Sequence, residues 1–420
     1  MGNYFGTAFM NVACLAKNKS HKGGLQETTD SLGCSAKDFP CKGMLQGTVA
    51  LYKGGLQGTV GSLDLIDCAF PIRVSFKKPL FADKQALQQA VHLYIETNGV
   101  QCFYGPIGTW DVSNIVDMSN LFEGYTTFNE PLQDWDVSNV VNMTNMFHGC
   151  HMFNQPLQAW DVSHVTNMEG MFYECTSFDQ PLEAWDVSHV CNMFAMFLNC
   201  HAFDQPLQAW DVSHVTNMEG MFYECNSFNQ PLQDWDVSNV DDMRCMFYAC
   251  HTFNQPLDTW DVSHIDNMVC MFYECTAFDQ PLDTWDVSHV TSMEETFYKC
   301  VAFNQPLAAW NVSNVSNMSR MFLKCTVFNQ PLANWDVSHV ITMEGMFQEC
   351  RAFNQPLQEW NVSQVNDMFG MFLECTLFDH NLFAWTQQNN SYLQTQQNKL
   401  FSNTNQCTHC FENKFDYVLK

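Results

Sequence analysis

A chain of 420 residues would ordinarily form two or three globular domains. Its 45 acidic residues outnumber its 18 basic ones and give a formal net charge of -27. Most of this charge lies in residues 110–384, which hold 36 Asp and Glu against five Lys and Arg. So few cations cannot neutralise phosphates, and this excludes nucleic acid and anionic membrane as expected partners of this region. No stretch approaches the roughly 18 apolar residues of a membrane span, so none is predicted.

The first 79 residues are rich in glycine and contain a small repetition. The phrase KGMLQGTV at residues 42–49 returns as KGGLQGTV at residues 53–60. Glycine at this density, with few large apolar residues, does not close a hydrophobic core. We therefore expect residues 1–79 to form a flexible N-terminal region.

A helix is predicted at residues 83–96. Leu87 and Val91 recur at helical spacing on one face, Asp83 is a suitable N-cap, and Gly99 follows as a stop. Solenoids need such a cover over their first repeat. Residues 80–109 are therefore predicted to form a capping helix and the segment that leads into the repeats.

A phrase of 25 residues then recurs eleven times. Its clearest copy, residues 160–184, opens with Trp-Asp-Val-Ser, continues with Met-x-x-Met-Phe-x-x-Cys and closes with Phe-Asp-Gln-Pro-Leu. A period of this size predicts a solenoid in which each unit buries its apolar side against the next. We assign residues 110–385 to this solenoid. All twelve tryptophans keep the register: Trp110, Trp135, Trp160, Trp185, Trp210, Trp235, Trp260, Trp285, Trp310, Trp335, Trp360 and Trp385.

Positions within a unit are numbered here from its tryptophan. Apolar residues at positions 9, 12, 13 and 16 follow the i, i+3, i+4, i+7 spacing typical of one helical face. In the clearest copy, Phe178 and Leu182 bracket an extended segment in which Pro181 excludes a fully paired central strand. The pattern predicts an α/β solenoid of eleven coils, each with a short helix and a short parallel strand or extended bridge near residues 178–182. Thr296 replaces a core Met, and since a buried hydroxyl needs a hydrogen-bond partner, its coil should be locally weak.

Ten of the twenty cysteines occupy position 16, from Cys150 to Cys375. A cysteine that recurs with the core is most simply a small buried hydrophobe. The other ten show no pairing pattern, and many free thiols are typical of a reducing compartment, although neighbouring coils can bring some position-16 thiols within bonding distance.

Residues 386–420 are rich in Gln and Asn and are predicted to be a disordered tail. The tail contains the pair Cys407 and Cys410, which is half of a zinc site; we interpret it as a stray motif.

Two polar rows raise metal binding as an alternative. His occupies position 5 in six units and Asn or Gln in the other five, an interchange typical of a hydrogen-bonded row along the turns. Asp occupies position 2 in nine units, as in Asp161, and Asn311 and Asn361 replace it freely. A calcium site would require the negative charge of Asp, whereas a side chain that only accepts backbone N–H bonds can be either Asp or Asn. We therefore expect turn capping, and no metal or cofactor.

The repeat phrase resembles the 25-residue repeat of BspA-like leucine-rich-repeat surface proteins, also described as a domain of unknown function in mycoplasma lipoproteins. The lead-in, from Ala90 and Val91 through Tyr104 and Pro106 to Trp110, resembles that family too, and the likeness covers about residues 80–385. The resemblance implies a leucine-rich-repeat-like solenoid without enzymatic activity and, for some members, attachment to host matrix proteins or cells.

Nothing in the repeats resembles a catalytic site, because each conspicuous polar residue recurs from unit to unit. We expect a monomeric, non-enzymatic solenoid that binds a protein, at the cell surface by resemblance or in the cytoplasm by its free cysteines. The alternatives are an intracellular structural spacer without a partner, and an enzyme within residues 1–79. The positions that vary between units should contact the partner. In the clearest copy, the candidate partner-binding residues are Glu169, Gly170, Tyr173, Glu174, Glu183 and Ala184.

Overall fold

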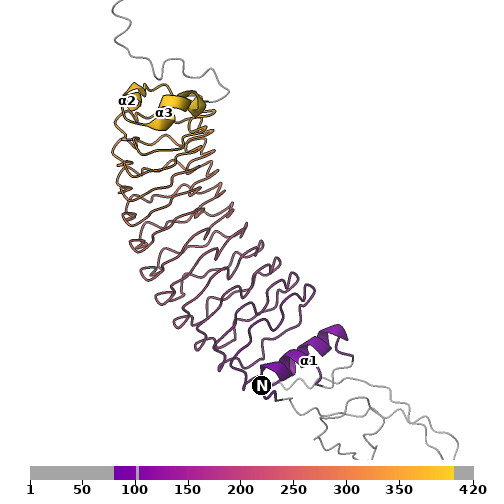
Figure 1. Cartoon of the computed structure of the whole chain (residues 1–420). Coiled ribbons are helices and arrows are strands. Elements are labelled where there is room, and N and C mark those ends of the chain that lie inside the picture. The colour runs from indigo at the N-terminus through magenta and orange to yellow at the C-terminus, as the bar shows by residue number, and fades with distance from the viewer. Residues whose placement is uncertain (1–79, 101–103, 402–420) are drawn as a thin grey trace, which may run out of the picture. The chain divides into compact units, whose positions relative to one another are not determined.

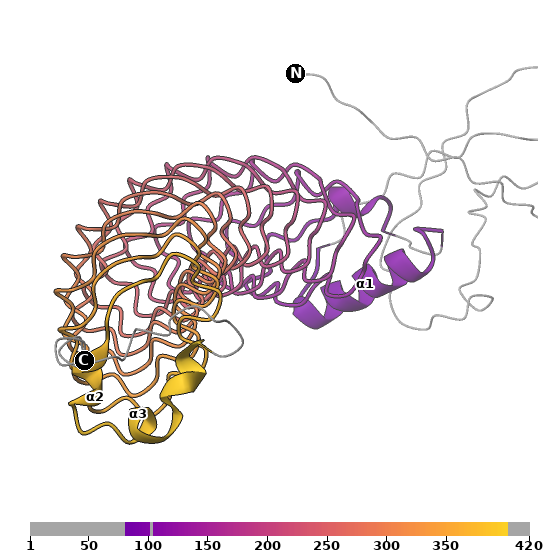
Figure 2. The ribbon, with the colours of Figure 1, turned by 90° about the horizontal axis from the view of Figure 1, so that it is seen from above.

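The computed structural model describes residues 80–100 and 104–401. The glycine-rich region and Cys407 and Cys410 lie outside the described residues. The described chain begins with α1 (Lys84–Glu96) and a short 3-10 helix, η2 (Ile107–Thr109), before the repeats. After the repeats come α2 (Phe383–Thr386), α3 (Ser391–Gln396) and η3 (Gln397–Phe401). Between these ends, the repeats stack one after another as a solenoid (Figures 1 and 2).

The helix predicted within each unit is wrong, because positions 9–16 form successive turns instead. In the clearest copy, the Met171 N–H donates to the Met168 carbonyl (3.1 Å) and the Cys175 N–H donates to the Phe172 carbonyl (2.8 Å). The third residue of each turn, at positions 11 and 15, has a positive φ in all eleven units, which is the geometry of a type II turn. The apolar spacing that suggests a helix therefore belongs to the core side of these turns.

The intervening N–H groups bond to the next unit rather than along a helix. Gly170 donates to the Phe194 carbonyl (2.8 Å) and Phe172 donates to the Met196 carbonyl (2.9 Å). Parallel bridges also join position 8 of neighbouring units, such as Asn142 and Asn167. Each unit thus uses its neighbour to satisfy its backbone, as buried N–H and C=O groups require.

The parallel bridge predicted near residues 178–182 lies at position 8 instead. Segment 178–182 is joined to the neighbouring unit by side-chain hydrogen bonds. The Asp179 N–H and the Gln180 Nε2 group both donate to Asn154 Oδ1, at 3.0 and 2.9 Å. The same arrangement recurs at position 20 of the next unit, where Asp179 Oδ1 accepts from Asp204 and Gln205. Pro181 is tolerated here because no backbone ladder needs its N–H.

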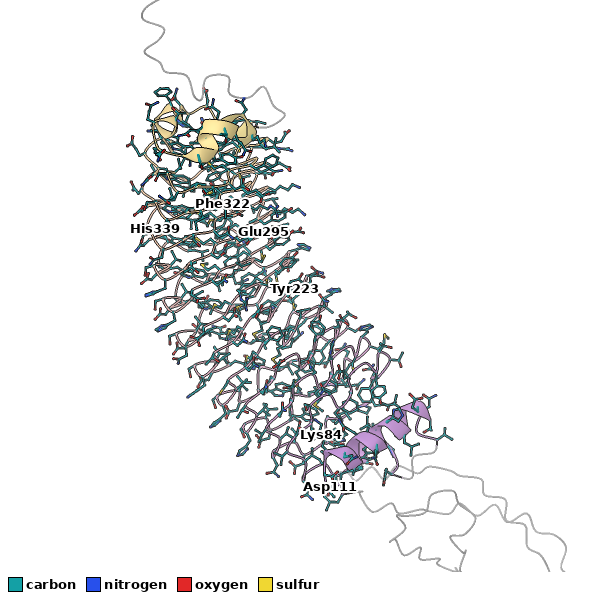
Figure 3. All side chains as sticks on the ribbon, in the orientation of Figure 1. Lys84, Asp111, Tyr223, Glu295, Phe322 and His339 are labelled. Atoms are coloured by element: carbon teal, nitrogen blue, oxygen red, sulfur yellow. The ribbon has the colours of Figure 1, made fainter. Side chains whose placement is uncertain are left out.

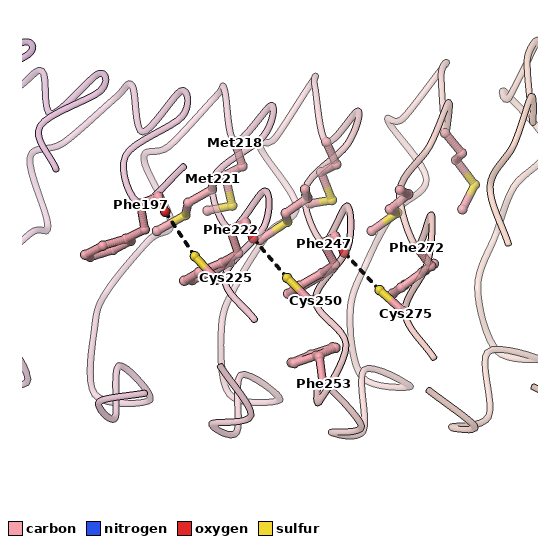
Figure 4. Close-up of a cluster of buried hydrophobic side chains, with 14 of the residues drawn as sticks. Phe197, Met218, Met221, Phe222, Cys225, Phe247, Cys250, Phe253, Phe272 and Cys275 are labelled. Carbon is pink, nitrogen blue, oxygen red and sulfur yellow. Dashed lines mark hydrogen bonds between the residues drawn. The ribbon is translucent and has the colours of Figure 1, made fainter. Parts of the chain in front are cut away.

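The core consists of stacked rows of identical side chains (Figure 4). Ten indole N–H groups, such as that of Trp235, donate to the position-23 carbonyl that lies 28 residues earlier, and the indole of Trp135 donates to the Ile107 carbonyl, all at 2.8–3.0 Å. The position-16 thiols donate to the position-13 carbonyl of the preceding unit, as Cys250 does to the Phe222 carbonyl at 2.9 Å. All ten of these cysteines are buried, so the prediction of a small core residue is confirmed, with a hydrogen bond added to it.

Thr296 is fully buried, and its hydroxyl lies 3.0 Å from the Met268 carbonyl and 2.9 Å from the Met293 carbonyl. The Thr296 hydroxyl therefore has hydrogen-bond partners. The expected reason for a locally weak unit, a buried hydroxyl without a partner, does not apply.

The spacing between units differs from row to row. Nearly parallel rings at equivalent positions are 4.1–4.3 Å apart in the Tyr row at position 14 but 6.4–6.5 Å apart in the Trp row. The Phe row at position 13 is intermediate, for example 5.7 Å between Phe247 and Phe272. A stack that is closer on one side must bend toward that side, and the repeats follow such a curve in Figure 1.

Both ends of the solenoid are covered. Helix α1 begins where the sequence predicts, with the Asp83 carboxylate accepting the Ala86 N–H at 2.9 Å. It buries Leu87 and Val91, and Tyr94 packs edge-on against Trp110.

Residues 386–401 were expected to belong to a disordered tail, and this is wrong. The carbonyls of Lys399 and Leu400 accept the Gly370 and Phe372 N–H groups, as a further unit would. Phe401 stacks on Phe372 with ring centroids 5.5 Å apart. The Gln-rich composition conceals these apolar residues.

Replacing Asn390 by Ala should loosen the C-terminal end. Its buried amide donates to the carbonyls of Val362 and Val365, and its Oδ1 accepts the Leu393 N–H at the start of α3. We expect the free energy of unfolding to fall by about 3 kcal/mol, because the buried Val365 carbonyl loses the Asn390 donor and α3 loses its N-cap. Hydrogen exchange should accelerate in residues 366–378 and leave the central units unchanged. Exposed Gln394→Ala is the matched control; equal exchange in both variants would contradict the role of Asn390.

Candidate functional site

The closely spaced side of the solenoid carries side chains that vary from unit to unit. We call positions 10, 11, 14 and 15 of each unit the inner face. Figure 3 shows Tyr223 and Glu295, from positions 14 and 11, on one edge of the stack, and Asp111 and His339, from positions 2 and 5, on the opposite edge. The turns at positions 9–16 place these residues, since they direct positions 9, 12, 13 and 16 into the core.

Four tyrosines form a continuous stack on the inner face. Tyr223, Tyr248, Tyr273 and Tyr298 occupy position 14 of consecutive units, with ring centroids 4.1–4.3 Å apart and planes within 3° of parallel. All four are partly exposed. Burial and hydrogen bonds to both neighbouring tyrosines raise the pKa of Tyr248. The stack is therefore an ordered aromatic surface in contact with solvent.

The inner face is acidic, with eleven Glu against four basic residues. All four basic residues form ion pairs with neighbouring units. Arg244 binds Glu219 at 2.8 Å and Asp242 at 2.7 Å, and Lys299 binds Glu274 at 2.5 Å. Arg320 and Lys324 pair with Glu295 and Glu349 at 3.2 and 3.5 Å. The cations are thus occupied within the protein, and the excess charge offered to solvent is negative.

The structure divides the six predicted contact residues. Glu169, Gly170, Tyr173 and Glu174 lie on the inner face, while the exposed Glu183 and Ala184 come just before Trp185, which belongs to the widely spaced Trp row. Gly170 is buried with φ +56°, and a Cβ there would lie 2.1 Å from Asn145 Oδ1. It can therefore shape the turn but presents no side chain. The tyrosine stack was missed, although Tyr at position 14 of four consecutive units signalled it.

The two outer polar rows shape turns. Asp186 Oδ1 accepts the Ser188 N–H at 3.1 Å and its hydroxyl at 2.6 Å, so turn capping by position 2 is confirmed. At position 5, Asn239 Nδ2 donates to the Ser213 carbonyl at 2.7 Å. Within the described ranges, no three His, Cys, Asp or Glu side chains gather as a metal site.

Comparison with known proteins now identifies the family. The model of the family described as "Mycoplasma protein of unknown function, DUF285" matches residues 93–210, 195–310 and 291–413. The chain belongs to this family. The match confirms the resemblance drawn from the repeat phrase, and DUF285 as described carries no assigned activity.

Two solved structures show a more distant likeness to this DUF285 chain. A leucine-rich cell surface protein from Faecalibacterium prausnitzii A2-165 is 14% identical over 58% of this chain and 76% of that one, with a TM-score of 0.29. A plant peptide hormone receptor, RGFR1 in complex with RGF2, is 5% identical over 64% and 51%, with a TM-score of 0.14. No curated protein matches the sequence. In the part of the chain that the structure describes, no helix is long and apolar enough to cross a bilayer.

Replacing Ser188 by Ala should raise the pKa of Asp186 in this DUF285 array. Hydrogen bonds from the Ser188 hydroxyl and N–H hold that pKa below 3.8. The carboxylate therefore contributes stability above the unfolded-state pKa, which is lost as the pH falls through the folded-state pKa. Carboxyl titration by NMR should show the pKa moving toward 3.8 in Ser188→Ala, and remaining low in Ser188→Thr. An unchanged pKa in Ser188→Ala would show that the hydroxyl is dispensable.

Proposed function

We propose that the chain is a non-enzymatic, leucine-rich-repeat-like solenoid that binds a protein through its inner face. The observation that carries this proposal is the stack of four partly exposed tyrosines, Tyr223 to Tyr298, within an acidic surface. Core packing explains the buried Trp, Phe and Met rows, but it does not require tyrosine at these exposed positions.

The physical properties of the stack favour binding. Tyrosine offers a large apolar ring and a hydroxyl with little conformational freedom to lose, and it is enriched at binding hot spots. Each ring is already held by its neighbours, so contact with a partner orders little that was mobile. The surrounding Glu residues favour a partner that presents Lys or Arg around an apolar or aromatic centre, since complementary charge promotes encounter and specificity.

Adhesion at a cell surface is the setting we favour, because the family resemblance that the repeat phrase supports is to surface proteins. The alternative is a spacer, in which the stacked units only set a distance. It is favoured by the regular outer rows, such as the Asp and Ser pairs of positions 2 and 4, which repeat with little variation.

A double variant, Tyr248→Ala with Tyr273→Ala, tests the proposal. The full-length chain is used to capture proteins from a host-cell extract, and each captured protein is then purified and titrated. We expect one partner to bind saturably to the wild type, with binding weakened by about tenfold or more in the variant because two aromatic contacts are lost.

The control variant is His189→Ala with His214→Ala, which removes two exposed rings from the opposite edge. Its affinity should equal that of the wild type, and circular dichroism should show all three proteins folded. Saturable binding that the tyrosine variant retains would exclude the stack as the binding surface. If no protein binds saturably to the wild type, the spacer alternative stands instead.

A further inference from the structure

One junction of the solenoid lacks part of its backbone ladder. At the other described junctions, position 7 donates its N–H to position 7 of the preceding unit, as Asp241 does to Thr216 at 2.8 Å. Within the described residues, neither this bond nor the position-8 bridge joins the unit of Trp235 to the unit of Trp260. Asp241 and Asp266 are both exposed at position 7 of these units. Like charges opposite each other weaken strand pairing, so the two carboxylates act against pairing at this junction.

Two half-exposed cysteines flank this junction on the inner face. Cys245 and Cys270 both occupy position 11, each with a φ of 56°. The Cys245 N–H donates to the Val269 carbonyl at 3.0 Å, so the units meet again beside the thiols. Equivalent rings of the same two units are 4.2 Å apart for Tyr248 and Tyr273 and 5.7 Å apart for the Phe pair at position 13. Position 11 lies on the same turns between these two rows, and the two thiols contact each other; from the neighbouring rows we infer a separation within the roughly 4.4–6.8 Å between the Cα atoms of a disulfide.

The two thiols also differ chemically. A hydrogen bond from Cys270 lowers the pKa of Cys245, and nearby Arg244 acts in the same direction. The same contact raises the pKa of Cys270, whose Sγ lies 3.6 Å from Glu295 Oε2. One sulfur is therefore the better nucleophile, and the other keeps its proton beside a carboxylate that can accept it.

We propose that Cys245 and Cys270 are a reversible dithiol–disulfide site that cross-links the two units across the interrupted junction, with a hydroperoxide as oxidant. This site is independent of the proposed binding function.

The chemistry needs no group beyond the two thiols and the peroxide. The Cys245 thiolate attacks one peroxide oxygen; an S–O bond forms, the O–O bond breaks, and the leaving oxygen takes a proton as water or an alcohol. The Cys270 sulfur then attacks the Cys245 sulfur; the S–S bond forms, the S–O bond breaks, and hydroxide leaves as water with the Cys270 proton. Two thiols are oxidised by two electrons, and one peroxide is reduced.

The fold provides an internal control in the same two units. Cys250 and Cys275 are also 25 residues apart, but both are buried and donate to the carbonyls of Phe222 and Phe247 at 2.9 Å. Burial raises the pKa of both thiols. The two cysteine pairs therefore have the same separation in the sequence but differ in exposure and nucleophilicity. Cys191 is a second control, since it is exposed with Thr166 and Thr216 at the equivalent positions of its neighbours.

The test treats the reduced full-length chain with hydrogen peroxide, blocks the remaining thiols with iodoacetamide, and cleaves between Cys245 and Cys270 before mass spectrometry. We expect a linked pair of peptides that dithiothreitol separates, with Cys250 and Cys275 unlinked. Hydrogen exchange at residues 266–270 should slow on oxidation. Cys245→Ser and Cys270→Ser should each abolish the link, whereas Cys191→Ser should retain it.

A second measurement uses only the wild-type chain and so does not depend on whether a variant folds. Phenylarsine oxide, which bridges two adjacent thiols, should protect Cys245 and Cys270 from iodoacetamide but leave Cys191 reactive. The proposal is overturned if peroxide leaves both cysteines free, if Cys245 links to another cysteine, or if the arsenical fails to protect the pair.

Discussion

The structure depends on hydrogen bonds that each repeat can make only with its neighbour. Alternate N–H groups of the turns, the tryptophan indoles and the position-16 thiols all donate to carbonyls of another unit. A single net hydrogen bond of this kind contributes about 1 kcal/mol, whereas a buried group left without a partner costs about 1–3 kcal/mol. An isolated unit would leave many such groups unpaired, so the unit of folding is a run of repeats. The end covers, α1 and residues 386–401, are required for the same reason.

The sequence predicts how the units are arranged better than it predicts the backbone conformation within a unit. Tryptophan, phenylalanine and cysteine mark the register because each recurs every 25 residues and each is buried. The helix of positions 9–16 was predicted wrongly because two successive turns bury the same positions as two helical turns. Asn120, Asn145 and Gly170 at position 11 suit positive φ, but Glu174 and Lys299 adopt it at position 15 against their own preference. Hydrogen bonds to neighbouring units explain why these residues adopt a positive φ, and such bonds cannot be predicted from a single repeat.

The inner face was predicted only in part for a related reason. Sequence variation identified positions 10, 11, 14 and 15 together with positions 7, 17, 18, 24 and 25, because variability alone does not tell which side of a unit a residue occupies. The structure separates Tyr173 from Glu183 and reveals that tyrosines at 25-residue intervals make one surface. The same geometry brings Cys245 and Cys270 together, although the sequence shows them only as unpaired thiols. What a side chain can do in this protein depends on its counterpart in the next repeat.

The uniform donor–acceptor register has an evolutionary consequence. Residues 160–175 and 210–225 are identical in sequence, and the indole and thiol hydrogen bonds described above recur between the same two positions at intervals of 25 residues. Unequal crossing-over between such stretches would add or delete whole units while leaving each indole and thiol opposite a carbonyl. The gene can therefore lengthen or shorten the solenoid and its inner face in steps of 25 residues, because each added unit makes the same contacts as the units already present.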